Sequence, residues 1–170
     1  LPGLVLRGQA GEWPPAGQPR LPVLMTAFNT ALLLGSGLLI WRAAEVMRAG
    51  DLPRLGRLMM STLTLGGCFL LIQGAEWVAL LSHGLTTRTS LYGSTFYAIV
   101  GCHGLHVLAA VGVLGVMTRR VRGEVRHMGE QPHGVADFVE ANLGPFLGTR
   151  MYWLFVVAVW PPLYWLVYLW

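Results

Sequence analysis

The hydrophobic positions of this chain gather into four long segments separated by polar stretches. The segments cover residues 23–44, 58–81, 91–117 and 151–170. Each is close to the roughly 20 predominantly apolar residues that an α-helix needs to cross a bilayer. Because a backbone inside a bilayer must satisfy its own hydrogen bonds, the pattern predicts an all-α, polytopic bundle of four transmembrane helices. Residues 23–170 then form one transmembrane helical domain.

The polar stretches between the segments predict the loops and the orientation. Residues 1–22 are rich in proline and glycine and predict an irregular periplasmic segment. Residues 45–57 and 118–149 predict cytoplasmic loops, the second with a short interfacial helix over 138–146. Nine of the 12 basic residues, all arginines, lie in or beside these two stretches. They are Arg42, Arg48, Arg54, Arg57, Arg119, Arg120, Arg122, Arg126 and Arg150. The positive-inside rule therefore predicts that the basic loops lie in the cytoplasm. The localisation expected is the bacterial plasma membrane, as a multi-pass protein.

Composition supports the membrane class and excludes several others. The chain is 54% hydrophobic and 12% charged, whereas a soluble domain carries about 25% charged residues. Cys68 and Cys102 lie inside apolar segments and form no C-x-x-C pattern, so neither a disulfide framework nor covalent c-type haem is expected. The basic stretches are short and lack interleaved aromatics, so no nucleic-acid partner is expected.

A few polar residues inside the segments are the candidates for chemistry. His103 and His106 are three residues apart on one predicted helix face, and Glu76 is the carboxylate deepest in a segment. Intramembrane acids are often functional, so Glu76 has two interpretations: part of a proton path, or a structural partner of Gln73, His103 or His106. Glu76 with the two histidines could also form a metal set of two histidines and one carboxylate. Packing is the interpretation favoured for the histidines, and no catalytic residue, metal ligand or cofactor-binding residue is predicted.

Several motifs, in order along the chain, resemble subunit III of the haem–copper oxidases, the family of cytochrome c and quinol oxidases. The motifs are Trp13-Pro14-Pro15, Asn29-Thr30, Ser36-Gly37, Thr64-Leu65-Gly66, Phe69, Gln73, Glu76-Trp77, Tyr92-Gly93-Ser94-Thr95-Phe96, His103-Gly104-Leu105-His106-Val107, Tyr152-Trp153, Phe155-Val156 and Trp160. The chain departs from the family pattern at two positions of the last helix. The family usually has a histidine and an acid there, and this chain has Leu154 and Val157. The family also has at least one helix before the Trp-Pro-Pro loop, so the resemblance implies that at least one family helix is missing before Leu1.

The resemblance implies a non-catalytic subunit of a respiratory terminal oxidase. Such a subunit packs beside catalytic subunit I, whose haem and copper carry the redox chemistry of cytochrome c oxidation, oxygen reduction and proton translocation. It binds phospholipid in a cleft, here expected between the second and third segments, and supports proton uptake. The lipid contacts expected are Arg120, His103 and His106. The buried structural residues expected are Glu76, Gln73, Trp77, Tyr92, Ser94 and Trp153.

Two other classes stay open at this point. An autonomous membrane cytochrome or metal-binding protein would use His103 and His106. A structural subunit of another respiratory supercomplex would share the four-helix pattern but associate with different chains.

Overall fold

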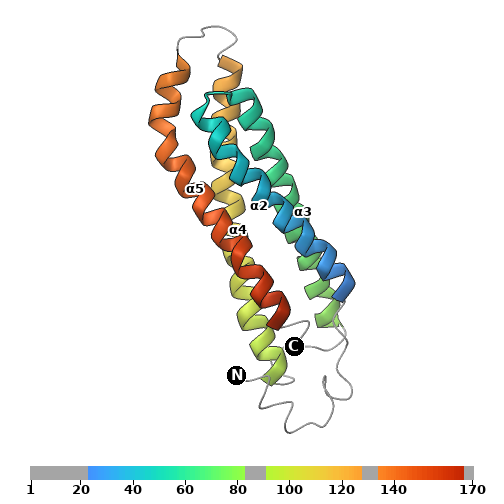
Figure 1. The fold of residues 1–170 in the computed structure, drawn as a ribbon. Coiled ribbons are helices and arrows are strands. Elements are labelled where there is room, and N and C mark those ends of the chain that lie inside the picture. The colour runs from blue at the N-terminus through green and yellow to red at the C-terminus, as the bar shows by residue number, and fades with distance from the viewer. Residues whose placement is uncertain (1–22, 83–90, 128–133, 167–170) are drawn as a thin grey trace.

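The described part of the chain folds into four long helices. The computed structural model describes residues 23–82, 91–127 and 134–166, which contain no strand. The helices are α2 (Val23–Arg48), α3 (Leu52–Ser82), α4 (Leu91–His127) and α5 (Val135–Tyr164), as Figure 1 shows. Each is long and apolar enough to cross a membrane, so the predicted all-α transmembrane bundle of four spans is confirmed. Expectations for residues 1–22, and for the side chains of Tyr92 and Ser94, lie outside what is described.

Neighbouring helices run antiparallel and form a closed ring. The helix α2 packs against α3 and α5, and α4 packs against the same two helices. The turn between α2 and α3, the C-terminal end of α4 and the N-terminal end of α5 all lie at the same end of the bundle, at the top of Figure 1. We call it the arginine end, because Arg42, Arg48, Arg54, Arg57, Arg119, Arg120, Arg122 and Arg126 all lie within nine residues of a helix terminus there.

A three-residue turn joins α2 to α3. Gly50 has φ +72°, a left-handed conformation that glycine adopts without a Cβ clash. The Asp51 amide donates to the Val46 carbonyl at 3.3 Å, which closes the end of α2. The Asp51 Oδ1 then accepts from the Arg54 amide at 3.0 Å and caps the start of α3. The range 45–57, predicted to be a loop, is therefore mostly helical.

The boundaries of the last two helices also differ from the prediction. The helix α4 continues to His127, and α5 begins at Val135, so most of the predicted loop 118–149 is helical. Residues 138–146 are helical as predicted, but they belong to the same helix as the last span. Hydropathy detects only the apolar part of a helix, whereas these helices continue with Val121 and Phe146 completely buried against their neighbours. Pro145 lies inside α5, although proline at such a position removes a backbone hydrogen bond.

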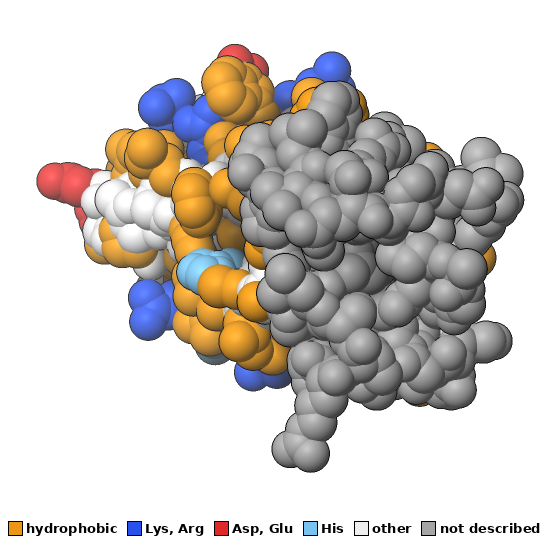
Figure 2. All heavy atoms as spheres, turned by 90° about the horizontal axis from the view of Figure 1, so that it is seen from below, with side chains coloured by type: hydrophobic (Ala, Val, Ile, Leu, Met, Phe, Trp, Pro, Cys, Tyr) orange, Lys and Arg blue, Asp and Glu red, His pale blue; other side chains and the backbone are white. Residues whose placement is uncertain are grey.

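The centre of the bundle is aromatic and its outer surface is apolar. Trp153, Trp160, Phe69 and Phe146 are the largest fully buried side chains. Many large hydrophobic residues are exposed, among them Leu71 at 76% and Leu105 at 69%. Figure 2 shows hydrophobic side chains over most of the described surface at the end opposite the arginine end. An apolar outer surface on helices of this length is what a lipid environment requires.

Candidate functional site

Glu76 joins α2 to α3 inside the bundle. Its side chain is 7% exposed. The Thr26 hydroxyl donates to both carboxyl oxygens at 3.1 Å, and Gln73 Nε2 donates to Oε2 at 2.9 Å. Among the alternatives raised by the sequence, the observed partner is Gln73, together with the unanticipated Thr26. In a membrane, such buried bonds connect helices, because a polar group in hydrocarbon needs a protein partner.

An aromatic stack lies between α3, α4 and α5. The ring of His103 stacks on Trp160 with centroids 5.1 Å apart, and Phe69 meets Trp160 edge-on at 5.0 Å. Trp160 Nε1 donates to the Thr30 hydroxyl on α2 at 2.8 Å. Trp160 thus contacts residues of all three other helices. This arrangement fixes the His103 ring by packing, while its buried Nε2 has no hydrogen-bond partner within the described structure.

A second tryptophan, Trp153, lies two helical turns before Trp160 on the same face of α5. Its Nε1 donates to the Ser36 hydroxyl of α2 at 3.0 Å, and the side chain is fully buried. The ring lies directly over Gly66 of α3, where an added Cβ would come within 2.6 Å of Cζ2. A glycine at this position therefore lets the Trp153 side chain extend across the centre of the four-helix bundle.

A lateral groove opens beside the aromatic stack, between α3 and α4. Its volume is about 730 Å³, which falls within the range typical of ligand sites. Its walls include Phe69, Trp77, His103, Leu105 and Trp160. The groove lies between the second and third spans, where the sequence predicted a lipid cleft. Its mainly apolar lining suits an acyl chain better than a charged headgroup.

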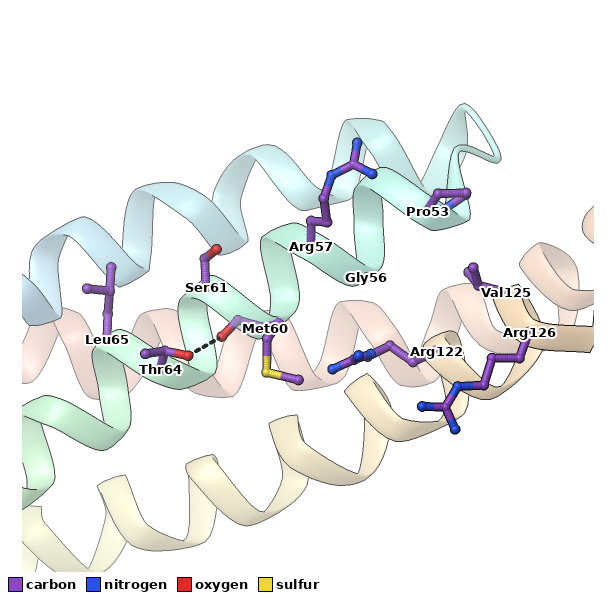
Figure 3. A pocket seen from close by; sticks show the side chains of 10 residues that line it. All are labelled: Pro53, Gly56, Arg57, Met60, Ser61, Thr64, Leu65, Arg122, Val125 and Arg126. Atoms are coloured by element: carbon purple, nitrogen blue, oxygen red, sulfur yellow. Dashed lines mark hydrogen bonds between the residues drawn. The ribbon is translucent and has the colours of Figure 1, made fainter.

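A second groove lies between α3 and α4 at the arginine end. It has a volume of about 760 Å³ and is lined by both helices. Its lining includes three arginines, Arg57 of α3 and Arg122 and Arg126 of α4. In Figure 3 the Arg57 side chain extends away from α4. The sequence analysis did not single out these three as a group.

The three expected lipid contacts do not come together. Arg120 lines a different, smaller groove of about 440 Å³ between α4 and α5, with Met117 and Tyr152. It is seventeen residues from His103 along α4, which is about 25 Å at 1.5 Å per residue. One headgroup cannot contact both side chains at that separation.

His106 also differs from His103 in its surroundings. It is exposed, and its Nδ1 lies 2.8 Å from the Cys102 carbonyl of its own helix. The helix face that the sequence predicted for both histidines therefore does not give them the same surroundings. A step of three residues turns the helix far enough to place one ring in the core and the other on the surface. Within the described ranges, no three His, Cys, Asp or Glu side chains form a group that could hold a metal ion.

Sequence reasoning missed the polar face of α2 as part of this site. Thr26 and Thr30 supply bonds to Glu76 and Trp160, and the Asn29 amide donates to the Phe69 carbonyl at 3.1 Å. Ser36 completes the series by accepting from Trp153. These residues recur at helical spacing, so a periodicity test confined to polar positions would have found the face.

The four apolar helices, with polar side chains turned inward, define a polytopic helical membrane protein. Residues 6–170 match the family model for cytochrome c oxidase subunit III. Cytochrome c oxidase subunit 3 of Strongylocentrotus purpuratus is 34% identical over 159 residues, which cover 93% of this chain and 55% of the relative. The corresponding protein of Locusta migratoria is 36% identical over 162 residues, with 94% and 55% covered. The chain belongs to the cytochrome c oxidase subunit III family, which confirms the resemblance, and it spans about half the length of these relatives.

Proposed function

We propose that this chain is a non-catalytic, accessory subunit of a cytochrome c oxidase. It packs beside the catalytic subunit that carries haem and copper and stabilises it, and it supports proton uptake without carrying protons itself. The observation behind the proposal is how the buried polar groups are used. Glu76, Trp153 and Trp160 each bond a neighbouring helix, as expected of groups that hold a bundle together. Membership of the cytochrome c oxidase subunit III family supports this choice of complex.

Co-purification tests this role. Extraction in a mild detergent through a tag on this chain should recover a subunit with haem and copper absorption. The chain separated from its companions should then show no Soret band. A Soret band that stays with the isolated chain, and disappears in His103→Ala, would establish the autonomous cytochrome instead. Recovery with a respiratory complex that lacks a haem–copper subunit would assign the chain to a different assembly.

The proposal includes phospholipid binding in the lateral grooves. The α3–α4 groove beside Trp77 and His103 has an apolar lining that fits acyl chains. The α4–α5 groove has Arg120 at one end and apolar residues such as Val113 and Val116 along it. An arginine in such a position binds a lipid phosphate while its aliphatic stem remains in the apolar layer. The arginine end then faces the cytoplasm of a bacterial cell, in accordance with the positive-inside rule.

Arg120→Ala is expected to weaken lipid retention in the α4–α5 groove. One arginine near an anionic surface contributes about 1 kcal/mol, so occupancy should fall roughly fivefold. Native mass spectrometry of the purified complex measures the retained lipid. Arg119→Ala is the matched control, because Arg119 is the exposed neighbour on α4 and lines none of the described grooves. Equal lipid retention by the two variants would remove Arg120 from the proposal.

A further inference from the structure

His106 is a polar residue on the outer surface of the bundle at mid-membrane depth. It is exposed, and on α4 it lies thirteen residues before Arg119 and fifteen after Leu91, or about 20 Å from each along the helix axis. The hydrocarbon core of a bilayer is about 30 Å thick, so the ring lies at the level of the acyl chains. A polar group at that depth is costly unless a protein group bonds it.

One nitrogen of the His106 ring is bonded and the other is not. Its Nδ1 lies 2.8 Å from the Cys102 carbonyl oxygen, one turn earlier on α4. A carbonyl oxygen can only accept, so Nδ1 carries the proton, and Nε2 of the neutral ring is then an acceptor. Within the described ranges nothing donates to Nε2. The helix therefore fixes the orientation of the ring and leaves its second nitrogen without a donor.

The surroundings of His106 on α4 and α5 do not supply that donor. Cys102 and Ala109, one turn to either side, are exposed on the same face of α4. On α5, the Tyr152 hydroxyl donates to the His106 carbonyl at 3.3 Å. That bond joins the two helices and uses the one proton of the hydroxyl, so Tyr152 has none left for Nε2.

A second transmembrane protein can supply the donor, whereas the acyl chains of a bilayer cannot. Acyl chains carry no N–H or O–H group, and the headgroups lie near the level of Arg119. Side chains of serine, threonine, asparagine and glutamine commonly form hydrogen bonds between transmembrane helices. The small side chain of Ala109 also lets the backbone of a neighbouring helix approach closely. A helix with a hydrogen-bond donor at mid-span therefore fits this surface.

We propose that the surface formed by Cys102, His106, Ala109 and Tyr152 docks a transmembrane helix of the catalytic subunit. A hydroxyl or amide side chain of that helix donates to His106 Nε2. The inference rests on the proposed function for the identity of the partner, and it adds the face of contact. It turns α4 and α5 toward the catalytic subunit and leaves the outer face of α3 to lipid. The surface lies further from the arginine end than the Arg120 groove and shares Tyr152 with it.

Photocrosslinking in intact membranes locates the contact. The photoreactive residue p-benzoylphenylalanine, placed at Ala109, should crosslink to a transmembrane helix of the haem–copper subunit beside a donor side chain. The control position is Leu71, which is 76% exposed on α3 and should crosslink to no oxidase subunit. Crosslinks to the haem–copper subunit from Leu71 and not from Ala109 would overturn the assigned face. A crosslink from Ala109 to a second copy of this chain, or to no protein, would overturn the assigned partner.

Substitution of His106 tests the hydrogen bond itself. His106→Leu should weaken association with the haem–copper subunit about three- to tenfold, as expected for one interhelical hydrogen bond in a membrane. His106→Gln, whose amide oxygen accepts at a similar reach, should retain most of that association. Both variants should unfold close to the wild-type midpoint as isolated chains, because Nε2 bonds nothing there. Wild-type association of His106→Leu in an intact oxidase would overturn this inference alone, whereas co-purification with a different complex would overturn the proposed function.

Discussion

Gly66→Ala is expected to destabilise the bundle by about 1–3 kcal/mol, the range for overpacking a well-packed core. The new methyl group would overlap the ring of Trp153, which is fully buried and cannot move outward without opening a helix contact. Any displacement of the ring also weakens its 3.0 Å bond to Ser36. The measurement is the midpoint of thermal or denaturant unfolding of the purified chain in detergent.

Gly67→Ala is the matched control for that experiment. The two glycines are adjacent on α3, but a Cβ added at Gly67 meets nothing within 4 Å. Both substitutions change helix propensity in the same direction, so the difference between them isolates the contact with Trp153. Trp153→Leu should reduce the cost of Gly66→Ala, because a smaller side chain leaves room for the methyl group. Equal stabilities of the two alanine variants would contradict the close packing described for Gly66.

The sequence predicted the number and type of the helices because the signal for a span is strong and local. It predicted the ends of the helices less well. The apolar segments end where the arginines begin, whereas the helices continue through the arginines. At the end of α4, Val121 is completely buried beside exposed Arg122, so an amphipathic extension follows the apolar span. In α5, Pro145 and the glycines around it favour a loop locally, and packing of the buried Phe146 outweighs that preference.

The sequence predicted which residues belong to the candidate site better than it predicted how those residues are arranged. Glu76, Gln73 and Trp153 are buried as expected, because polar or bulky residues in an otherwise apolar span face protein. Their partners depend on the rotation of each helix and on which helices are neighbours, and one sequence does not specify either. Glu76 therefore bonds Thr26 of α2, a partner that the sequence had not suggested, and neither of the α4 histidines that it had suggested. Arg120 lies on the side of α4 that faces α5.

Glu76→Leu is expected to have a second large effect on stability. Leucine removes the acceptor of the Thr26 hydroxyl and the Gln73 amide, which are both buried donors. A buried hydrogen bond contributes about 0.5–1.5 kcal/mol of net stability, so losing the bonds to these two donors should cost about 1–3 kcal/mol in total. The unfolding midpoint should fall by an amount comparable to that of Gly66→Ala. Thr26→Val in the same background should add less than it costs alone, because the two residues share one bond.

Glu76→Gln separates the structural role from a proton path. The amide keeps an oxygen in place to accept from Thr26 or Gln73 and has nearly the same shape, so the chain should fold and assemble almost normally. A glutamine cannot carry a proton, and a route through residue 76 would therefore be closed. We expect the initial rate of oxygen reduction by the assembled oxidase to stay close to the wild-type rate, because the carboxyl group serves to hold α2 against α3. Loss of turnover in a variant with wild-type assembly and stability would falsify that role and place Glu76 in proton transfer.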